Sequence, residues 1–596
     1  MSILTREILA SAASSPHCLI VGTLADPVRL TWREVHEQAK RMAGGLAARG
    51  IGRHCSVAVL AADAGDVAPL AQAIWLRRAA LTMLQQPTPR TDLAVWLADT
   101  VRAILMIRAD LVVVGEPFLI AQDHLTAHNL AVCTVESLHG AEPIELDDAD
   151  EADIAMRQLT SGSTGIPKAV EISHGNFAAN TVAMCAGLDV QVDREVSLSW
   201  LPLSHDMGMI GFLCVPMQLG AQAIVVTPDQ FLRRPIVWAE LITKHRATIT
   251  SGPNFAYSIL ARVLERADPA AIDLSSLRVA GNGAEPIDHR DLKNFAAVGA
   301  RFGLRPSAPM PVYGLAETTL AVSFGAVYDP PIFDLVSRDA IAAAHYARPM
   351  PEHRDMAQQI VCVGFPVKGM EVRIVREGSV QGPREIGSIE LRGPTVARSY
   401  LTLDGVIPFV RQDGWFDSGD LGYLDEEGRL YVCGRTKDLI VVAGNNLYPH
   451  DIERAAENVD GVRKGCVIAL RVDAEPEGFA VLAEVRNPED EDACLRISRE
   501  IAARVTGQVG HAPRDVRLFP AGTLPKTLSG KLRRTFAREL LPQGARGADT
   551  TEATSEMADA ESATVIDCAE QTDAPHRRHP AGQVVQVVKQ VSLRRC

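Results

Sequence analysis

Two Ser/Gly-rich runs with lysines stand hundreds of residues apart in this chain. The first spans 159–168 and reads LTSGSTGIPK, and the second spans 524–534 and reads LPKTLSGKLRR. Glycines let a backbone approach a ligand closely, hydroxyl and N–H groups donate to phosphate oxygens, and a lysine adds positive charge. The first run therefore predicts a loop that binds a polyphosphate. The second run predicts that another domain completes the same site.

Length and composition favour a soluble, multidomain enzyme. The 596 residues exceed what one hydrophobic core supports, and 47% apolar with 22% charged residues is typical of globular proteins. A formal net charge of −13 argues against nucleic-acid binding, which favours a basic surface. The 11 cysteines contain no CxxC pair, so we expect reduced thiols in the cytoplasm rather than zinc sites or disulfides.

Two segments bear on membrane targeting. The N-terminal run MSILTREILASAASS lacks a long apolar core, so no signal peptide is expected. The stretch 207–228 carries no charged residue and is long enough to cross a bilayer, but Gly, Pro and Gln interrupt it. We expect a buried helix followed by a buried strand there, and no membrane span.

Strands and helices alternate along most of the chain, which predicts an α/β fold. We place a large domain at 1–433 and a small α+β domain at 434–541. From 542 the composition becomes rich in Ala, Thr and Glu and then basic, so 542–596 is expected to be a disordered tail. A capping box at 31–34 (TWRE) predicts the start of a helix.

Three turns in the large predicted domain carry candidate functional groups. The run WLPLSHDMG at 200–208 places His205 beside the uncharged stretch. The run NGAEP at 282–286 follows a predicted strand and offers a backbone edge to a flat base. The run YGLAETT at 313–319 brings together an aromatic ring, hydroxyls and the Glu317 carboxylate, and a carboxylate is a preferred ligand of Mg²⁺.

Two more polar turns lie near the predicted domain boundary. The run DSGDL at 417–421 places Asp420 after a tight turn, where its carboxylate can accept both hydroxyls of a ribose. The run GRTKD at 434–438 lies between two predicted strands and supplies Arg435 to the same nucleotide. Taken singly, these turns also fit structural readings: a core histidine, a loop, an Asp-turn or a surface arginine.

The order and spacing of these runs resemble the adenylate-forming superfamily, which contains acyl-CoA synthetases, adenylation domains and luciferases. The resemblance covers roughly residues 30–541. WLPLSHDMG, NGAEP, YGLAETT and the Tyr-Pro pair at 448–449 are most similar to the fatty acyl-AMP ligases. The resemblance implies a large, multi-subdomain adenylate-forming N-terminal domain and a small, mobile α+β C-terminal domain.

The resemblance also implies a role for each matching residue. The β- and γ-phosphates would contact Thr160, Ser161, Gly162, Ser163, Thr164, Gly165 and Lys168. Adenine would contact Gly283, Ala284, Glu285 and Tyr313, and ribose would contact Asp420 and Arg435. Thr318 would serve the α-phosphate, and Glu317 would be the metal ligand. Lys531 would reach the acyl carboxylate and the α-phosphate, Lys437 would lie at the domain hinge, and His205 would flank the acyl site.

Two positions depart from the ligase pattern. Ser204 stands where these ligases often have an aromatic residue, and Asn445 stands where many relatives have arginine. The first difference bears on the shape of the acyl pocket. Neither difference touches the residues expected to hold the nucleotide.

The implied reaction is activation of a fatty acid to acyl-AMP and pyrophosphate, with ATP and Mg²⁺ as cofactors. The acyl group would then pass to the phosphopantetheine thiol of an acyl carrier protein, or of a polyketide or peptide synthetase acting in trans. The nearest alternative is a long-chain acyl-CoA synthetase, which shares every core motif. Residues 326–359 are our candidate for the insertion that hinders coenzyme A use in the ligases, although they also fit an ordinary surface excursion.

A non-catalytic adenylate-binding scaffold is an alternative from another class. It is disfavoured because Lys531, Glu317, Asp420 and Lys168 are all present. Pyrophosphate release would separate the enzyme from the scaffold.

Overall fold

The computed structural model describes residues 1–87, 91–144, 148–160, 168–351, 357–442, 445–472, 478–526 and 532–541. They form two compact units: a large unit that contains Met1–Leu439 and a small unit that contains Ile440–Pro525. The predicted α/β class is confirmed. The division into domains at 433/434 stays a prediction, and the predicted tail at 542–596 lies outside the described residues.

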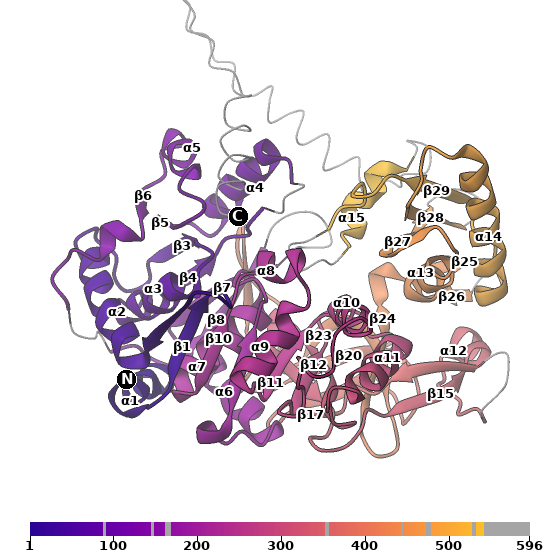
Figure 1. Ribbon diagram of the computed structural model, residues 1–596, viewed down its shortest axis with the longest axis horizontal. Helices are drawn as coiled ribbons and strands as arrows, with labels where there is room; N and C mark the ends of the chain where they lie inside the picture. The colour runs from indigo at the N-terminus through magenta and orange to yellow at the C-terminus, as the bar shows by residue number, and fades with distance from the viewer. Residues whose placement is uncertain are drawn as a thin grey trace, which may run out of the picture. The chain divides into compact units, whose positions relative to one another are not determined.

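A nine-stranded sheet lies in the large unit, and several of its strands, among them β1, β10, β11 and β12, are labelled in Figure 1. Its strands, in order, are β17 (Phe365–Pro366), β14 (Ala321–Phe324), β13 (Pro309–Gly314), β12 (Val279–Asn282), β11 (Ile249–Gly252), β9 (Val196–Ser199), β10 (Gln222–Val225), β1 (Cys18–Gly22) and β2 (Pro27–Thr31). The strands from β13 to β1 run parallel, and the outer pairings are antiparallel.

An eight-stranded sheet carries the N-terminal residues of the phosphate-loop motif. Its strands, in order, are β22 (Gly405–Pro408), β21 (Ser399–Thr402), β8 (Lys168–Ser173), β7 (Ile154–Thr160), β4 (Ala80–Met83), β3 (Ser56–Leu60), β5 (Leu111–Val114) and β6 (Val132–Thr134). The apolar runs SVAVL of β3 and LVVV of β5 are buried throughout, as expected for central parallel strands covered on both faces.

Two smaller sheets complete the large unit. The five-stranded sheet has the order β19 (Ser379–Val380), β18 (Glu371–Arg376), β20 (Gly387–Arg392), β23 (Phe416–Leu424) and β24 (Leu430–Arg435). The second is a two-stranded sheet of β15 (Phe333–Ser337) and β16 (Ala357–Val361).

Helices lie between the strands of the large unit. They are α1 (Ile3–Ser14), α2 (Trp32–Ala47), α3 (Ala64–Leu76), α4 (Leu93–Met106), α5 (Ala121–Ala127), α6 (His174–Gly187), α7 (Val215–Leu219), α8 (Pro228–Arg233), α9 (Val237–His245), α10 (Asn254–Leu264), α11 (His289–Ala300) and α12 (Arg338–Ala344). The capping box predicted for α2 is confirmed: Glu34 N–H donates to Thr31 Oγ1 at 3.2 Å, and Thr31 N–H donates to Glu34 Oε2 at 2.8 Å.

The uncharged stretch 207–228 is buried inside the large unit. It forms a π-helix at Met207–Cys214 (η3), then α7, and then strand β10, which confirms the predicted helix followed by a strand. Among the residues that the structure describes, no helix is both long and apolar enough to cross a membrane.

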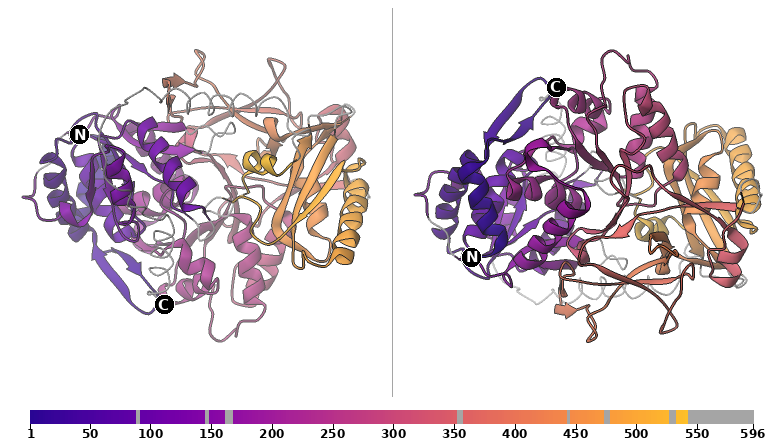
Figure 2. Two further views of the ribbon diagram at one scale, coloured as in Figure 1. Left: turned by 90° about the horizontal axis from the view of Figure 1, so that it is seen from above. Right: turned by 90° about the horizontal axis from the view of Figure 1, so that it is seen from below.

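The small unit is an α+β fold. Its strands are β25 (Ile440–Val442) with β26 (Asn445–Leu447), and β27 (Val462–Val472), β28 (Gly478–Val485) and β29 (Asp515–Phe519) in one sheet. Its helices are α13 (Pro449–Glu457), α14 (Glu491–Val509) and α15 (Arg534–Ala537). Helix α14 runs along the β27–β29 sheet (Figure 2) and buries Ile497, Ile501 and Val505, the apolar stripe predicted from the sequence.

Candidate active site

Three predicted motifs follow neighbouring parallel strands. His205 lies in the turn after β9, Gly283 follows β12, and Glu317 lies shortly after β13. Because β9, β11, β12 and β13 are parallel neighbours, their carboxyl ends meet at one edge of the nine-stranded sheet. Such an edge is a common place for ligands in α/β proteins. The fold therefore gathers segments that are far apart in the sequence.

The Asp420 carboxylate, on β23, is paired on both oxygens. Tyr313, near the end of β13, donates its hydroxyl to Asp420 Oδ2 at 2.6 Å. Arg435, at the end of β24, donates from Nε to Asp420 Oδ1 at 3.0 Å. We call these three residues the Asp420 cluster. Their association places three predicted nucleotide residues in direct contact.

Burial dominates the ionisation of the Asp420 cluster. Asp420 is 4% exposed, and its burial raises the pKa of the carboxyl, while Arg435 and the Tyr313 hydroxyl oppose that rise. Burial also raises the pKa of Tyr313, and the Asp420 charge adds to the effect. Tyr313 therefore stays a neutral hydrogen-bond donor at physiological pH.

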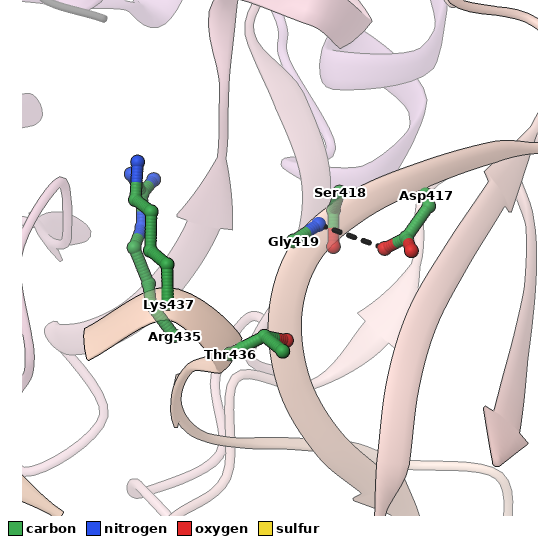
Figure 3. A pocket seen from close by; sticks show the side chains of 6 residues that line it. All are labelled: Asp417, Ser418, Gly419, Arg435, Thr436 and Lys437. Atoms are coloured by element: carbon green, nitrogen blue, oxygen red, sulfur yellow. Dashed lines mark hydrogen bonds between the residues drawn. The ribbon is translucent and has the colours of Figure 1, made fainter. Parts of the chain in front are cut away.

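A pocket of about 340 Å³ opens beside this cluster (Figure 3). It is lined by Asp417, Ser418, Gly419, Arg435, Thr436 and Lys437. Asp417 accepts a hydrogen bond from Gly419 N–H at 2.9 Å, which fixes the turn before Asp420. Figure 3 shows the side chains of Arg435 and Lys437 pointing the same way from the end of β24 and the 3₁₀ turn Thr436–Asp438. Two cations at the rim suit a negatively charged ligand.

A second group of contacts surrounds Glu317. Tyr400, on β21, donates its hydroxyl to Glu317 Oε1 at 2.6 Å. Lys168 Nζ lies 3.7 Å from the same oxygen and 3.4 Å from the centre of the Tyr400 ring. We call Lys168, Glu317 and Tyr400 the Glu317 cluster. It joins the predicted phosphate lysine to the predicted metal ligand.

Electrostatics connect the two clusters. Burial lowers the pKa of Lys168, the Glu317 carboxylate opposes that change, and the Arg435 charge adds to it. In return, the Glu317 charge contributes to the raised pKa of Asp420. Tyr313, near the end of β13, and Glu317, in the following 3₁₀ turn Ala316–Thr318, belong to one short segment, so the two clusters are parts of one polar site.

The adenine motif forms a tight turn against β13. A Cβ on Gly283 would lie 2.6 Å from the Val312 carbonyl oxygen, so this position requires glycine. Ala284 follows with a φ of +66°. The Glu285 carboxylate accepts a hydrogen bond from Phe255 N–H at 2.7 Å, near the start of α10. The backbone of this turn, rather than the Glu285 side chain, is the part suited to a base.

Thr318 and the residues around His205 have mainly structural contacts. Thr318 is fully buried and donates its hydroxyl to the Leu315 carbonyl at 2.9 Å. His205 Nδ1 lies 2.5 Å from Asp206 Oδ1, at the start of the π-helix. Ser204 is buried, and its carbonyl accepts from Gln158 Nε2 at 3.0 Å. The roles predicted for Thr318 and His205 stay predictions.

Some predicted residues lie outside the described residues: Ser161, Gly162, Ser163, Thr164, Gly165 and Lys531. Thr160 and Lys168 are described and flank the loop as cross-strand partners of β7 and β8. The sequence analysis missed Tyr400, because the run RSYL at 398–401 contains no turn or glycine signal. Only the pairing of β21 with β8 brings this tyrosine into the site.

Comparison with known proteins places these features in a family. The family model described as AMP-binding enzyme matches residues 10–401. A protein of Mycobacterium tuberculosis named "Putative ligase Rv1013" is 48% identical over 90% of this chain and 98% of its own length. The medium-chain fatty acid–acyl-carrier-protein ligase JamA of Moorena producens is 32% identical over 67% of this chain and 69% of its own length.

A solved structure from work on the fatty acyl-adenylate ligases of E. coli and L. pneumophila has a TM-score of 0.83 to this chain. It is 28% identical and covers 93% of this chain and 98% of its own. The predicted resemblance to fatty acyl-AMP ligases is therefore confirmed. Since the family model also matches more than half of the sequence, this chain belongs to the AMP-binding enzyme family.

Proposed function

We propose that this chain activates a fatty acid with ATP and then transfers the acyl group to a carrier-protein thiol. The observation that carries the proposal is the meeting of the two clusters at one site: Asp420, Tyr313 and Arg435 suit a nucleoside, and Lys168 with Glu317 suits its phosphates. The similarity to ligases that act on fatty acids supports the choice of substrate.

The first step joins two anions. A fatty-acid carboxylate oxygen attacks the α-phosphorus of ATP, a P–O bond to pyrophosphate breaks, and acyl-AMP forms. Lys168 would hold the phosphates with its charge, and Lys531 would stabilise the negative charge that develops at the α-phosphorus. Arg435 and Tyr313 keep Asp420 oriented, so that the carboxylate can accept the ribose hydroxyls.

Glu317 suits a Mg²⁺ ion that is held mainly by the substrate's phosphates. Its Oε1 accepts a hydrogen bond from Tyr400 and lies 3.7 Å from Lys168 Nζ, whereas Oε2 accepts no hydrogen bond within the described part of the chain. One carboxylate oxygen together with phosphates and water is a common arrangement for Mg²⁺. When bound, the ion would neutralise phosphate charge.

The second step is acyl transfer. A thiol sulfur attacks the acyl carbon of acyl-AMP, AMP leaves with the electron pair of the broken C–O bond, and the thiol proton is released. A phosphopantetheine thiol on a carrier would bring protein contacts that raise its local concentration. Free coenzyme A is the alternative acceptor.

The segment 326–359 is our candidate for the feature that disfavours coenzyme A. In the described residues, β15 and β16 pair as a separate two-stranded sheet in the large unit. Asp334 ties this sheet to its surroundings: Arg384 Nη1 and the Tyr423 hydroxyl each donate to Asp334 Oδ2 at 2.7 Å. A strand pair held in this way can restrict the access of a thiol.

One assay tests the proposal. The purified chain is given ATP, Mg²⁺, a panel of fatty acids and either coenzyme A or holo-carriers, and acyl-AMP and thioester are measured separately. We expect fatty-acid-dependent pyrophosphate release, acyl-AMP with coenzyme A alone, and thioester with a holo-carrier. Shortening 326–359 should increase acyl-CoA formation and leave adenylation intact. Efficient acyl-CoA synthesis by the unmodified chain would support an acyl-CoA synthetase instead.

A further inference from the structure

Tyr400 touches both charged members of the Glu317 cluster. Its hydroxyl donates to Glu317 Oε1 at 2.6 Å, and its ring lies 3.4 Å below the Lys168 ammonium. One side chain therefore provides a hydrogen bond to an anion and an aromatic face to a cation. Neither contact could be expected from the sequence motifs.

The sheet register explains how Tyr400 reaches Lys168. Tyr400 pairs with Val170 across the antiparallel β21–β8 ladder. Lys168 lies two residues before Val170, so it is on the same face of the sheet as Tyr400. Diagonal neighbours of this kind are within reach of an aromatic ring and a long side chain.

A backbone contact brings Glu317 to the same place. Ala397 N–H donates to the Glu317 carbonyl at 2.8 Å, which ties the 3₁₀ turn Ala316–Thr318 (η4) to the segment before β21. Phe409 supports the ring of Tyr400 from another side, with a centroid distance of 4.4 Å. Tyr400 is therefore fixed by its neighbours and can in turn fix Glu317 and Lys168.

We propose that Tyr400 is a positioning residue of the nucleotide site: its hydroxyl fixes Glu317 through Oε1, and its ring holds the Lys168 ammonium. The carboxylate then keeps Oε2 for a Mg²⁺–phosphate complex, and the ammonium stays near the phosphates. This inference rests on the proposed function, because it assigns the two contacts to ATP use.

The two contacts have separate consequences. Loss of the hydroxyl frees Glu317 to rotate, which weakens the site for a divalent cation more than for ATP itself. Loss of the ring removes the cation–π contact, which weakens the site for ATP even without metal. Burial raises the pKa of Tyr400, so its hydroxyl remains protonated and continues to donate at neutral pH.

Three variants separate these effects: Tyr400→Phe, Tyr400→Leu and Ser399→Ala. The first removes only the hydroxyl, and the second removes both contacts. The third alters the neighbouring residue on β21, which faces the opposite side of the sheet and donates to Glu171 at 3.1 Å rather than to Glu317. ATP affinity is measured by calorimetry in EDTA and in Mg²⁺, and pyrophosphate release is measured across Mg²⁺ concentrations. Thermal unfolding shows that each variant is folded.

For Tyr400→Phe we expect unchanged ATP affinity in EDTA and a roughly tenfold higher half-saturating Mg²⁺ concentration, since a hydrogen bond to a charged group is lost. For Tyr400→Leu we expect ATP affinity in EDTA to fall about fivefold as well. Ser399→Ala should match the unmodified chain in both measurements. If Tyr400→Leu does not fold, the Mg²⁺ dependence of Tyr400→Phe still tests whether Tyr400 positions Glu317.

The inference is overturned if Tyr400→Phe has the Mg²⁺ dependence of the unmodified chain, or if Ser399→Ala reproduces the shift expected for Tyr400→Phe. In those cases the unmodified chain still binds ATP and releases pyrophosphate, so the proposed function stands. If the unmodified chain neither binds ATP nor releases pyrophosphate, the proposed function itself is wrong and the inference falls with it.

Discussion

Asp420 and Glu317 are carboxylates of one polar site with different surroundings. Asp420 is 4% exposed, and both of its oxygens accept hydrogen bonds from protein side chains. The Glu317 side chain is 13% exposed, and the hydrogen bond that it accepts from a side chain in the described residues falls on Oε1. A buried acceptor with two donors has a fixed orientation, which suits recognition of a neutral ribose. A partly exposed carboxylate with one engaged oxygen suits a cation.

The two clusters also differ in how their cations, Arg435 and Lys168, are held. Arg435 makes a directed hydrogen bond to Asp420, and the Asp420 charge raises the pKa of its guanidinium. Lys168 is held by a carboxylate oxygen and an aromatic face, and burial lowers its pKa. Arginine thus acts as a directed hydrogen-bond donor, and lysine supplies a compact point charge.

The largest expected effect comes from a residue outside both clusters. Lys531→Ala should reduce acyl-AMP formation by about 150-fold or more, because one charge contact to the transition state contributes on the order of 3 kcal/mol. Fatty-acid-dependent pyrophosphate release measures the loss, and ATP affinity should change little. Near-normal release would mean that the clusters supply all the charge the reaction needs.

Glu317→Gln should have the next largest effect. Glutamine can still accept the Tyr400 hydroxyl but has no charge for Mg²⁺, so turnover should fall by about 2.5 kcal/mol, roughly 70-fold, and partly recover at high Mg²⁺. Glu171→Gln is the matched control, because Glu171 lies on β8 but on the face opposite to Lys168 and pairs with Arg157. If Glu317→Gln and Glu171→Gln have the same Mg²⁺ dependence, Glu317 is not the metal ligand.

Asp420→Asn should raise the Michaelis constant for ATP roughly 30-fold. The ribose hydroxyl pair loses a charged acceptor, which corresponds to a loss of about 2 kcal/mol in binding free energy. In contrast to Glu317→Gln, its Mg²⁺ dependence should not change. Asp417→Asn is the control, since Asp417 lines the same pocket but, within the described residues, accepts a hydrogen bond from Gly419 N–H alone. If the Michaelis constant for ATP is unchanged in Asp420→Asn, Asp420 does not bind the ribose and the division of roles between Asp420 and Glu317 is wrong.

Most of the fold could be predicted from local sequence patterns. The capping box at Thr31 and the apolar stripe of α14 are local signals, and both were confirmed. Strand β29 (Asp515–Phe519) was missed, because its run DVRLF is short, contains charged residues and pairs in parallel with the distant β28. Register between distant strands is set by packing and leaves no periodic signal in the sequence.

The site was predicted less completely than the fold. Glycine and acidic turns pointed to the Asp420 and Glu317 segments, but not to the partners of their carboxylates. Tyr313 was expected to face adenine, and the structure shows its hydroxyl bonded to Asp420. Tyr400 had no signal, since its place depends on the β21–β8 register. Sequence motifs locate such segments, whereas the contacts between them arise only from the fold.

The smallest expected effect is a pH dependence of the Glu317 cluster. Burial lowers the pKa of Lys168, so its charged form, present below that pKa, is lost earlier than in an ordinary lysine as pH rises. ATP affinity should therefore fall as the pH rises above neutral toward the ordinary lysine range of about 10.4, where the phosphates of ATP are already ionised. Tyr313 and Tyr400 do not contribute, because burial raises both of their pKa values.

Lys168→Arg should flatten this decline, since a guanidinium keeps its charge throughout the range. Lys244→Arg is the matched control, because Lys244 is exposed and donates to the Leu24 carbonyl, away from both clusters. Calorimetric ATP titrations at several pH values measure the slope for each variant. The same slope in Lys168→Arg and in the unmodified chain would assign the decline to another group, and the Lys168 ammonium would then be no more sensitive to pH than Arg435. A flat profile in Lys168→Arg alone would place the titrating cation in the Glu317 cluster and leave the Asp420 cluster as the part of the site that is insensitive to alkaline pH.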